Sequence, residues 1–113
     1  MKSKISSLSK SEDFKNLLSG RKISNPYSTI FFKKLSLKDN KLLNVSFVTK
    51  RKIGNAVKRN KIKRRLRNIM NDAIKKISIK LQYSYLVIAK PTMLSNEFNN
   101  IKETLFQEFE RIK

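Results

Sequence analysis

The sequence predicts an α+β fold, a sandwich in which helices pack on a small β-sheet. Residues 27–37 and 42–49 are rich in β-branched and aromatic side chains, as strands are, and residues 83–89 are almost wholly apolar. Two segments with apolar residues at helical spacing, 56–77 and 96–112, stand before and after that third strand. The length of 113 residues suits one domain, residues 1–113.

A short first helix is predicted over residues 11–19. Ser9 and Glu12 have the spacing of a capping box, in which each side chain accepts a hydrogen bond from a backbone N–H at the helix start. Gly20 suits the position just after the helix. The apolar side of this helix consists of Leu8, Phe14, Leu17 and Leu18.

The strand over residues 42–49 alternates between an apolar face and a more polar one. The two faces consist of Leu43, Val45 and Phe47, and of Asn44, Ser46 and Val48. The sequence Lys38-Asp39-Asn40 favours a hairpin turn between this strand and the one before it. The same strand is expected to bend or split near Thr49.

The last strand and helix complete a predicted order of helix, strand, strand, helix, strand, helix. The strand over residues 83–89 is expected in the centre of the sheet, covered on both faces, and Pro91 ends it. Ser95 or Asn96 is expected to cap the last helix, with Glu97 in its first turn. One apolar stripe runs along this helix: Phe98, Ile101, Leu105, Phe109 and Ile112.

Basic residues lead into the long helix predicted over residues 56–77 and fill its first half. Ten Lys and Arg residues fall between positions 50 and 67, and no acidic residue occurs between Asp39 and Asp72. Solvated helices usually place opposite charges four residues apart, so this surface repels itself unless a polyanion covers it. Successive residues of a helix are rotated by about 100°, and this rotation brings several apolar residues to one face. We expect that face to pack against the sheet. That face consists of Ile62, Leu66, Ile69 and Ala73, with Ile77 at its edge.

The opposite side of this helix is predicted to bind RNA. Guanidinium groups match phosphate in bidentate fashion, and amides can donate to phosphate or accept from a sugar hydroxyl. Gly54 allows a positive φ or a close backbone approach where the chain enters the helix, and Asn55 can cap it. Arg59 and Lys63 flank one edge of the apolar face, and Arg65 flanks the other. The candidate RNA-binding residues are Lys50, Arg51, Lys52, Asn55, Lys58, Arg59, Asn60, Lys61, Lys63, Arg64, Arg67 and Asn68, with Asn71 on the same side.

The overall charge also favours a polyanionic partner. The chain has 27 Lys and Arg against 8 Asp and Glu, a formal net charge of +19. Nucleic acid is the commonest polyanion that neutralises such a charge, and an anionic membrane surface is the other candidate. No apolar run reaches the roughly 18 residues of a membrane span, and residues 1–10 lack the apolar core of a signal peptide. A cytoplasmic protein is therefore expected.

The available side chains argue against intrinsic catalysis. The absence of Cys and His removes disulfides, Cys-based metal sites and the usual general base. A two-metal nuclease needs several converging carboxylates, whereas four of the eight acidic residues lie along the last helix beside its apolar stripe. We therefore expect no catalytic residue and no metal ligand in this chain.

The basic segment resembles the signature of the bacterial ribonuclease P protein subunit. Residues 52–67 read KIGNAVKRNKIKRRLR. The positions that match the family's pattern in type and spacing are Lys52, Gly54, Ala56-Val57, Arg59-Asn60, Lys63-Arg64 and Arg67. The resemblance extends to Glu12-Asp13-Phe14 in the first helix, to residues 85–89 and to the final helix. It implies a small mixed four-stranded sheet with three helices. It also implies a left-handed βαβ crossover, in which the basic helix joins two parallel strands.

The resemblance implies a function as well. The protein of this family binds a large catalytic RNA, and together they remove the 5′ leader from precursor tRNA, with magnesium held through the RNA. A monomer in a one-to-one complex with that RNA is expected. Contacts with the catalytic RNA, or help in organising metal ions near it, would come from Lys52, Arg59, Asn60, Lys63, Arg64 and Arg67.

A groove on the sheet beside the first helix would, by the same resemblance, hold the single-stranded leader. Phe14 matches an aromatic residue of that groove, and Leu18 stands where many relatives have a second Phe. Tyr27 or Phe31 would supply the aromatic side chain of the first strand, near Ser28.

Three alternatives stay open. A ribosomal or other structural RNA-binding protein would fit the charge and size, but it does not explain the Gly-Asn-Ala-Val to Arg-Asn spacing. A DNA-binding module could place the basic helix in a major groove, although the helix pair of a helix-turn-helix is absent. A membrane-surface helix fits less well, because the apolar side of the basic helix has no Trp or Phe.

Overall fold

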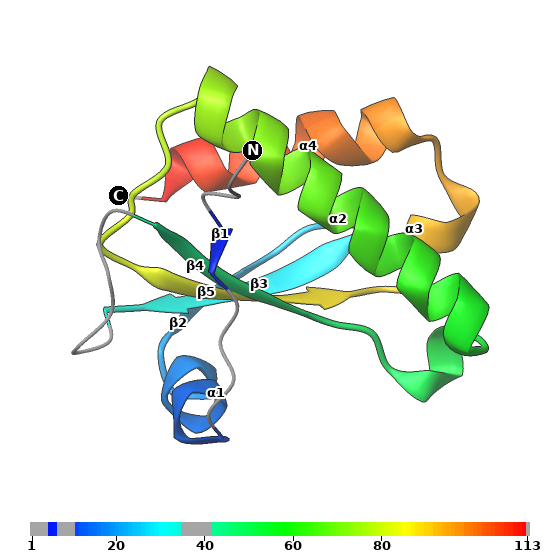
Figure 1. The fold of residues 1–113 in the computed structure, drawn as a ribbon, viewed down its shortest axis with the longest axis horizontal. Coiled ribbons are helices and arrows are strands. Elements are labelled where there is room, and N and C mark those ends of the chain that lie inside the picture. Colours follow the sequence, from blue (N-terminus) through cyan, green and yellow to red (C-terminus); the bar gives the residue numbers. More distant parts are fainter. Residues whose placement is uncertain (1–4, 7–10, 35–41, 113) are drawn as a thin grey trace.

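The computed structural model describes residues 5–6, 11–34 and 42–112, and it shows one sheet with helices on both faces (Figure 1). The strands are β1 (Ile5–Ser6), β2 (Arg21–Ser24), β3 (Ser28–Lys33), β4 (Leu43–Val48) and β5 (Ser84–Ala89). The helices are α1 (Ser11–Leu18), α2 (Ala56–Lys76), α3 (Thr92–Ser95) and α4 (Phe98–Arg111), and the 3₁₀ turn η1 (Arg51–Ile53) precedes α2. The predicted α+β class is confirmed, and α1, α2 and α4 are the three predicted helices.

The sheet is mixed, with the strand order β1-β4-β5-β3-β2. β4 and β5 are parallel neighbours joined through α2, whereas β3 runs antiparallel to both β5 and β2. The four longer strands form the predicted four-stranded sheet, and the two residues of β1 extend its edge beside β4. The βαβ unit therefore places the start of α2 just beyond the carboxyl end of β4.

Two predictions about the strands are wrong. β5 lies between β3 and β4, so these two strands do not pair as the hairpin that residues 38–40 suggested; the turn itself lies outside the described residues. The predicted strand does not split near Thr49, because β4 ends at Val48, and the additional strand of the sheet is β2. β2 has the sequence Arg-Lys-Ile-Ser, which carries too little apolar pattern to reveal an edge strand.

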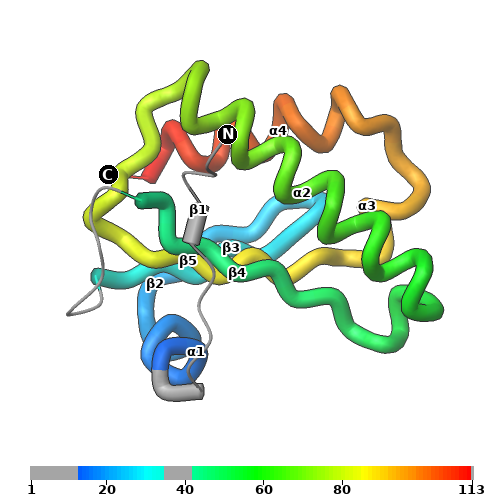
Figure 2. The backbone as a smooth tube through the Cα atoms, viewed as in Figure 1, coloured from blue at the N-terminus to red at the C-terminus, as the bar shows by residue number. Residues whose placement is uncertain are grey.

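Each face of the sheet is covered differently. α2 and α4 pack on one face, and α1 packs on the other, as Figure 2 shows. The predicted alternation of β4 is confirmed, since Val45 belongs to the larger core and Val48 packs on the α1 side. The predicted central position of β5 is also confirmed: Val87 packs on the α2 side and Leu86 on the α1 side.

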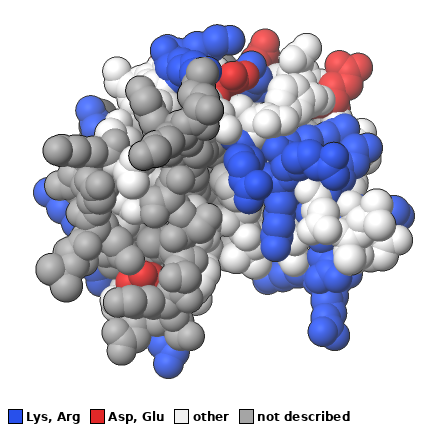
Figure 3. Space-filling model, viewed as in Figure 1, with Lys and Arg blue, Asp and Glu red and all other residues white. Residues whose placement is uncertain are grey.

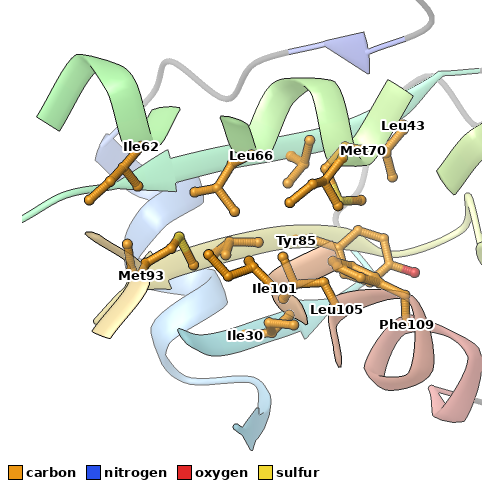
Figure 4. Close-up of a cluster of buried hydrophobic side chains, with 14 of the residues drawn as sticks. Ile30, Leu43, Ile62, Leu66, Met70, Tyr85, Met93, Ile101, Leu105 and Phe109 are labelled. Atoms are coloured by element: carbon orange, nitrogen blue, oxygen red, sulfur yellow. The ribbon is translucent and has the colours of Figure 1, made fainter. Parts of the chain in front are cut away.

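The larger core fills the space between the sheet, α2 and α4 (Figure 4). The predicted apolar face of α2 is fully buried at Ile62, Leu66, Ile69 and Ala73, and Met70 is buried beside it. The predicted stripe of α4 is buried as well, with Phe98 partly so. The Tyr85 and Phe109 rings meet edge to face at 5.2 Å between centroids. α2 is thereby fixed on the sheet by its apolar face, and its other side is left to solvent.

The ends of α1 and α4 show how local chemistry sets the boundaries. Gly20 follows α1 as predicted, and it allows a close approach, because a Cβ there would lie 2.8 Å from the Phe32 carbonyl oxygen. The predicted cap of α4 is wrong: Glu97 occupies the N-cap position, and the Asn96 amide donates to the Thr92 carbonyl oxygen at 2.6 Å.

Ser9, the predicted capping residue of α1, lies outside the described residues. Within those residues, no helix has the length and apolarity needed to cross a membrane.

Candidate nucleic-acid interface

The entry into α2 is a tight, well-defined turn. Gly54 has φ 155° and ψ −166°, a backbone conformation that side chains other than glycine rarely adopt. The Asn55 side-chain oxygen accepts a hydrogen bond from the Lys58 N–H at 3.0 Å and caps the helix. Both predictions for this turn, a positive φ at Gly54 and a cap at Asn55, are confirmed. The turn fixes where the basic residues of η1 stand relative to those of α2.

The basic residues gather on the exposed side of this region. Figure 3 shows Lys and Arg side chains over the part of the molecule where the first half of α2 runs. Eleven of the twelve candidate RNA-binding residues are exposed: Lys50, Arg51, Lys52, Asn55, Lys58, Asn60, Lys61, Lys63, Arg64, Arg67 and Asn68. No acidic side chain occurs among residues 42–71, so the whole surface has one sign.

Arg59 differs from the other candidates. It is half-buried at the edge of the apolar face of α2, and its Nε atom is enclosed without a hydrogen-bond partner. A buried polar atom without a partner costs free energy, and this sets Arg59 apart from the exposed cations of the same segment. Arg65 and Asn71 are also half-buried, whereas the sequence placed Asn71 on the outward side.

A second, apolar surface lies on the α1 side of the sheet. Leu17 and Leu86 are buried at its centre, and Phe14, Phe31, Val48 and Ile88 pack around them while keeping part of their surface open. Leu18 stands one helical turn after Phe14 and is 52% exposed. The structure therefore brings Phe14, Leu18 and Phe31 to one side of the sheet.

Tyr27 does not join this surface. It packs against the larger core and follows a turn in which the Asn25 side-chain oxygen accepts hydrogen bonds from the Tyr27 and Ser28 N–H groups, each at 2.9 Å. The sequence also missed Val48 and Ile88 as members of the apolar surface. Strand alternation could have found them, because Ile88 lies two residues after Leu86, and Val48 follows Phe47, which packs on the opposite face.

Asp72 and Tyr85, which lie outside the basic surface, make structural contacts. The Lys102 ammonium donates to the Asp72 carboxylate at 2.6 Å, and this hydrogen bond is the main cause that lowers the pKa of Asp72. Burial, helped by nearby Tyr83, raises the pKa of Tyr85 far above its usual range, and its hydroxyl donates to the Lys80 carbonyl oxygen at 2.6 Å. Among the described residues, no three Asp or Glu side chains come together as a metal site would require.

Comparison with known proteins identifies the family. The family model described as Ribonuclease P matches residues 2–113. The ribonuclease P protein component of Carboxydothermus hydrogenoformans is 32% identical over 101 residues, which cover 87% of this chain and 83% of that protein. The ribonuclease P protein component of Nitratiruptor sp. is 32% identical over 89 residues, covering 79% of this chain and 74% of that protein.

The fold agrees with these relatives. The RNase P protein from Thermotoga maritima superposes with a TM-score of 0.81 at 26% identity, over 96% of this chain and 98% of that one. The RNase P protein of Staphylococcus aureus has the same fold, with a TM-score of 0.77 at 24% identity, over 94% of this chain and 93% of that one. Because the family model spans nearly the whole sequence, this chain belongs to the bacterial ribonuclease P protein family and is a protein subunit of ribonuclease P.

Proposed function

We propose that residues 1–113 act as one domain that binds the catalytic RNA of ribonuclease P and the 5′ leader of precursor tRNA. The two ligands would meet two different surfaces, which we name the basic surface and the apolar surface. The basic surface consists of the twelve candidate RNA-binding residues between Lys50 and Asn68. The apolar surface consists of Phe14, Leu18, Phe31, Val48 and Ile88.

The observation that carries this proposal is the exposed, single-sign basic surface on a rigidly anchored helix. Guanidinium and ammonium groups there can neutralise phosphates, and the fixed apolar face of α2 spares the entropy of ordering the helix on binding. RNA binding would also relieve the self-repulsion of a chain with a net charge of +19.

The apolar surface is suited to single-stranded RNA. Phe14 and Phe31 are each partly open, so unpaired bases could stack on them, at about 1–3 kcal/mol per base. Paired bases are already stacked in a helix, so this surface favours the leader over the folded part of the tRNA. Tyr27 packs against the other core, so Phe31 is the better candidate for the strand aromatic.

Hydrolysis would belong to the RNA and to magnesium held through it. The described residues bring no carboxylate cluster to either surface, and the chain has no His or Cys to act as base or nucleophile. The protein would instead reduce repulsion between the two RNAs and extend the contact with the precursor. The protein is proposed to act in the cytoplasm as a monomer bound to one RNA.

The test is cleavage of a precursor tRNA by a bacterial ribonuclease P RNA at low magnesium, with and without this protein. We expect the protein to restore cleavage at the mature 5′ end, and the protein alone to cleave nothing. Binding without activation beyond that of an unrelated basic protein would contradict the proposal and favour a ribosomal-type role. Cleavage by the purified protein alone would contradict the assignment of catalysis to the RNA.

The same assay tests the apolar surface. Phe14→Ala and Phe31→Ala should weaken binding of a precursor with a long leader and leave binding of a precursor with a one-nucleotide leader unchanged. Tyr27→Ala is the matched aromatic control and should not distinguish the two precursors. Equal losses on both precursors would show that these rings support the fold and do not contact the leader.

A further inference from the structure

Val57 is exposed in the middle of the basic surface, and contacts within the protein do not account for its apolar side chain. It is 75% exposed, and among the described residues the only other exposed large apolar side chain is Leu18, at 52%. A β-branched residue is also a poorer helix former than the Ala and Lys residues on either side of it. Neither the core nor the stability of α2 therefore explains a valine here.

The turn that carries Val57 is held in place on both sides. The Asn55 carbonyl oxygen accepts a hydrogen bond from the Arg59 N–H at 3.0 Å, and the Asn55 side chain caps the Lys58 N–H. The Lys58 stem covers Gly54 so closely that an added Cβ would lie 2.8 Å from Lys58 Cδ. Val57 is therefore presented on a pre-ordered turn, and a partner would not have to order it.

Exposed cations lie along the face of α2 that carries Val57. Lys61 and Arg64 lie four and seven residues further on, which places them on the side of α2 that carries Val57, and both are exposed. The exposed Lys50, Arg51 and Lys52 stand before the same turn. RNA phosphates bound by these cations would bring sugars and bases next to the valine.

We propose that Val57 contacts an unpaired nucleobase of the catalytic RNA. A side chain without polar atoms cannot bind phosphate, and the flat face of an unstacked base is the largest apolar surface that RNA offers. Such a contact adds affinity that does not depend on counterion release. The inference rests on the proposed RNA binding by the basic surface and names one component of it.

Salt titration separates this contact from the charged ones. Val57→Ala removes two carbon atoms and favours the helix, so we expect a folded protein whose affinity for the RNA falls about five- to tenfold. The slope of log affinity against log salt should stay that of the native protein, because no charge changes. Gln107→Ala, at an exposed position of α4, is the matched control and should bind like the native protein.

A second measurement identifies the contacted group. The chain has no cysteine, so Val57→Cys offers a single point for attaching a photoreactive benzophenone, and Gln107→Cys offers the control. We expect Val57→Cys to cross-link to an unpaired nucleotide of the RNA, and Gln107→Cys to give no such product. Native affinity in Val57→Ala, or a cross-link only to base-paired nucleotides, would overturn the inference while native binding stands. Failure of the native protein to bind the RNA would instead overturn the proposed function.

Discussion

At the scale of single residues, the entry into α2 shows how one backbone conformation places a functional surface. Gly54 joins η1 to α2 with a φ of 155°, and Asn55 then caps the helix. The basic residues before and after this turn belong to one surface only because the turn is sharp. Gly54 and Asn55 could both be assigned from sequence, because they stand directly before the basic helix, where a turn and an N-cap are expected.

Gly54→Ala should therefore destabilise the protein. The substitution forces an L side chain into a backbone region, φ 155°, that such residues rarely adopt. We expect the free energy of unfolding to fall by about 1–3 kcal/mol, measured by urea denaturation. Lys61→Ala, at an exposed position of the same helix, should leave the unfolding midpoint nearly unchanged. A midpoint for Gly54→Ala equal to that of the native protein would show that the turn tolerates other residues.

The surroundings of Arg59 and Tyr27 could not be predicted from their positions in the sequence. Helical geometry placed Arg59 at the edge of the apolar face, but it could not show that its Nε atom would be enclosed without a partner. Tyr27 and Phe31 were equivalent candidates for the leader surface. Only the assembled sheet shows that Phe31 faces α1 while Tyr27 packs with the larger core. Such distinctions depend on residues far away in the sequence.

At the scale of elements, one ion pair ties α2 to α4. The Lys102 ammonium lies 2.6 Å from the Asp72 carboxylate, and Lys102 also lies 5.6 Å from the centre of the Phe106 ring. The Asp72 side chain is 39% exposed, so solvent screens the pair and limits its contribution to at most about 1 kcal/mol. The pair supports the packing of two helices whose apolar faces supply most of the stability.

The stability contributed by this pair should depend on pH. The pKa of Asp72 is lower in the folded protein than its usual 3.8, because it accepts a hydrogen bond from Lys102 and lies near Lys76 and Lys75. The contribution is therefore complete well above pH 3.8 and is lost as the pH falls through the folded value. We expect Asp72→Asn to melt below the native protein at pH 7, and the difference to shrink towards pH 2.

The control for this prediction is a second ion pair within α4. Arg111 and Glu108 are 3.7 Å apart, and Arg111 is 78% exposed, so Glu108→Gln should change the melting temperature less at pH 7. A difference between native protein and Asp72→Asn that is constant across this pH range would show that the carboxylate charge does not contribute.

The elements themselves were predictable where their signal is local. α2 was expected over residues 56–77 and spans Ala56–Lys76, because its apolar face, cap and basic composition all lie within one segment. The predicted pairing of β3 with β4 was wrong because strand order depends on contacts between distant parts of the chain. β3 and β4 are neighbours in sequence, but β5 lies between them, and this order depends on how α2 returns the chain to the sheet. β2 was missed because its exposed edge position requires few apolar residues.

At the scale of the whole molecule, the acidic residues are unevenly distributed. Residues 42–71 contain no acidic residue, whereas Glu97, Glu103, Glu108 and Glu110 lie at or along α4. Acidic side chains are poorly suited to a surface that approaches phosphate, so the proposed RNA complex would place the first half of α2 towards the RNA and the outer side of α4 away from it. This orientation predicts that cations at the two ends of α2 are not equivalent.

The dependence of RNA affinity on salt tests that orientation. Arg64→Ala and Arg67→Ala each remove one exposed cation from the first half of α2, so each should weaken binding and lower the salt slope by somewhat less than one unit. Lys75→Ala removes an exposed cation from the last turn of the same helix and should change the slope much less. All three variants should keep the native circular dichroism spectrum, since none of these side chains is part of the core. Equal changes of slope in all three would mean that the RNA responds to the total charge of the protein, and the proposed basic surface would then have no special role.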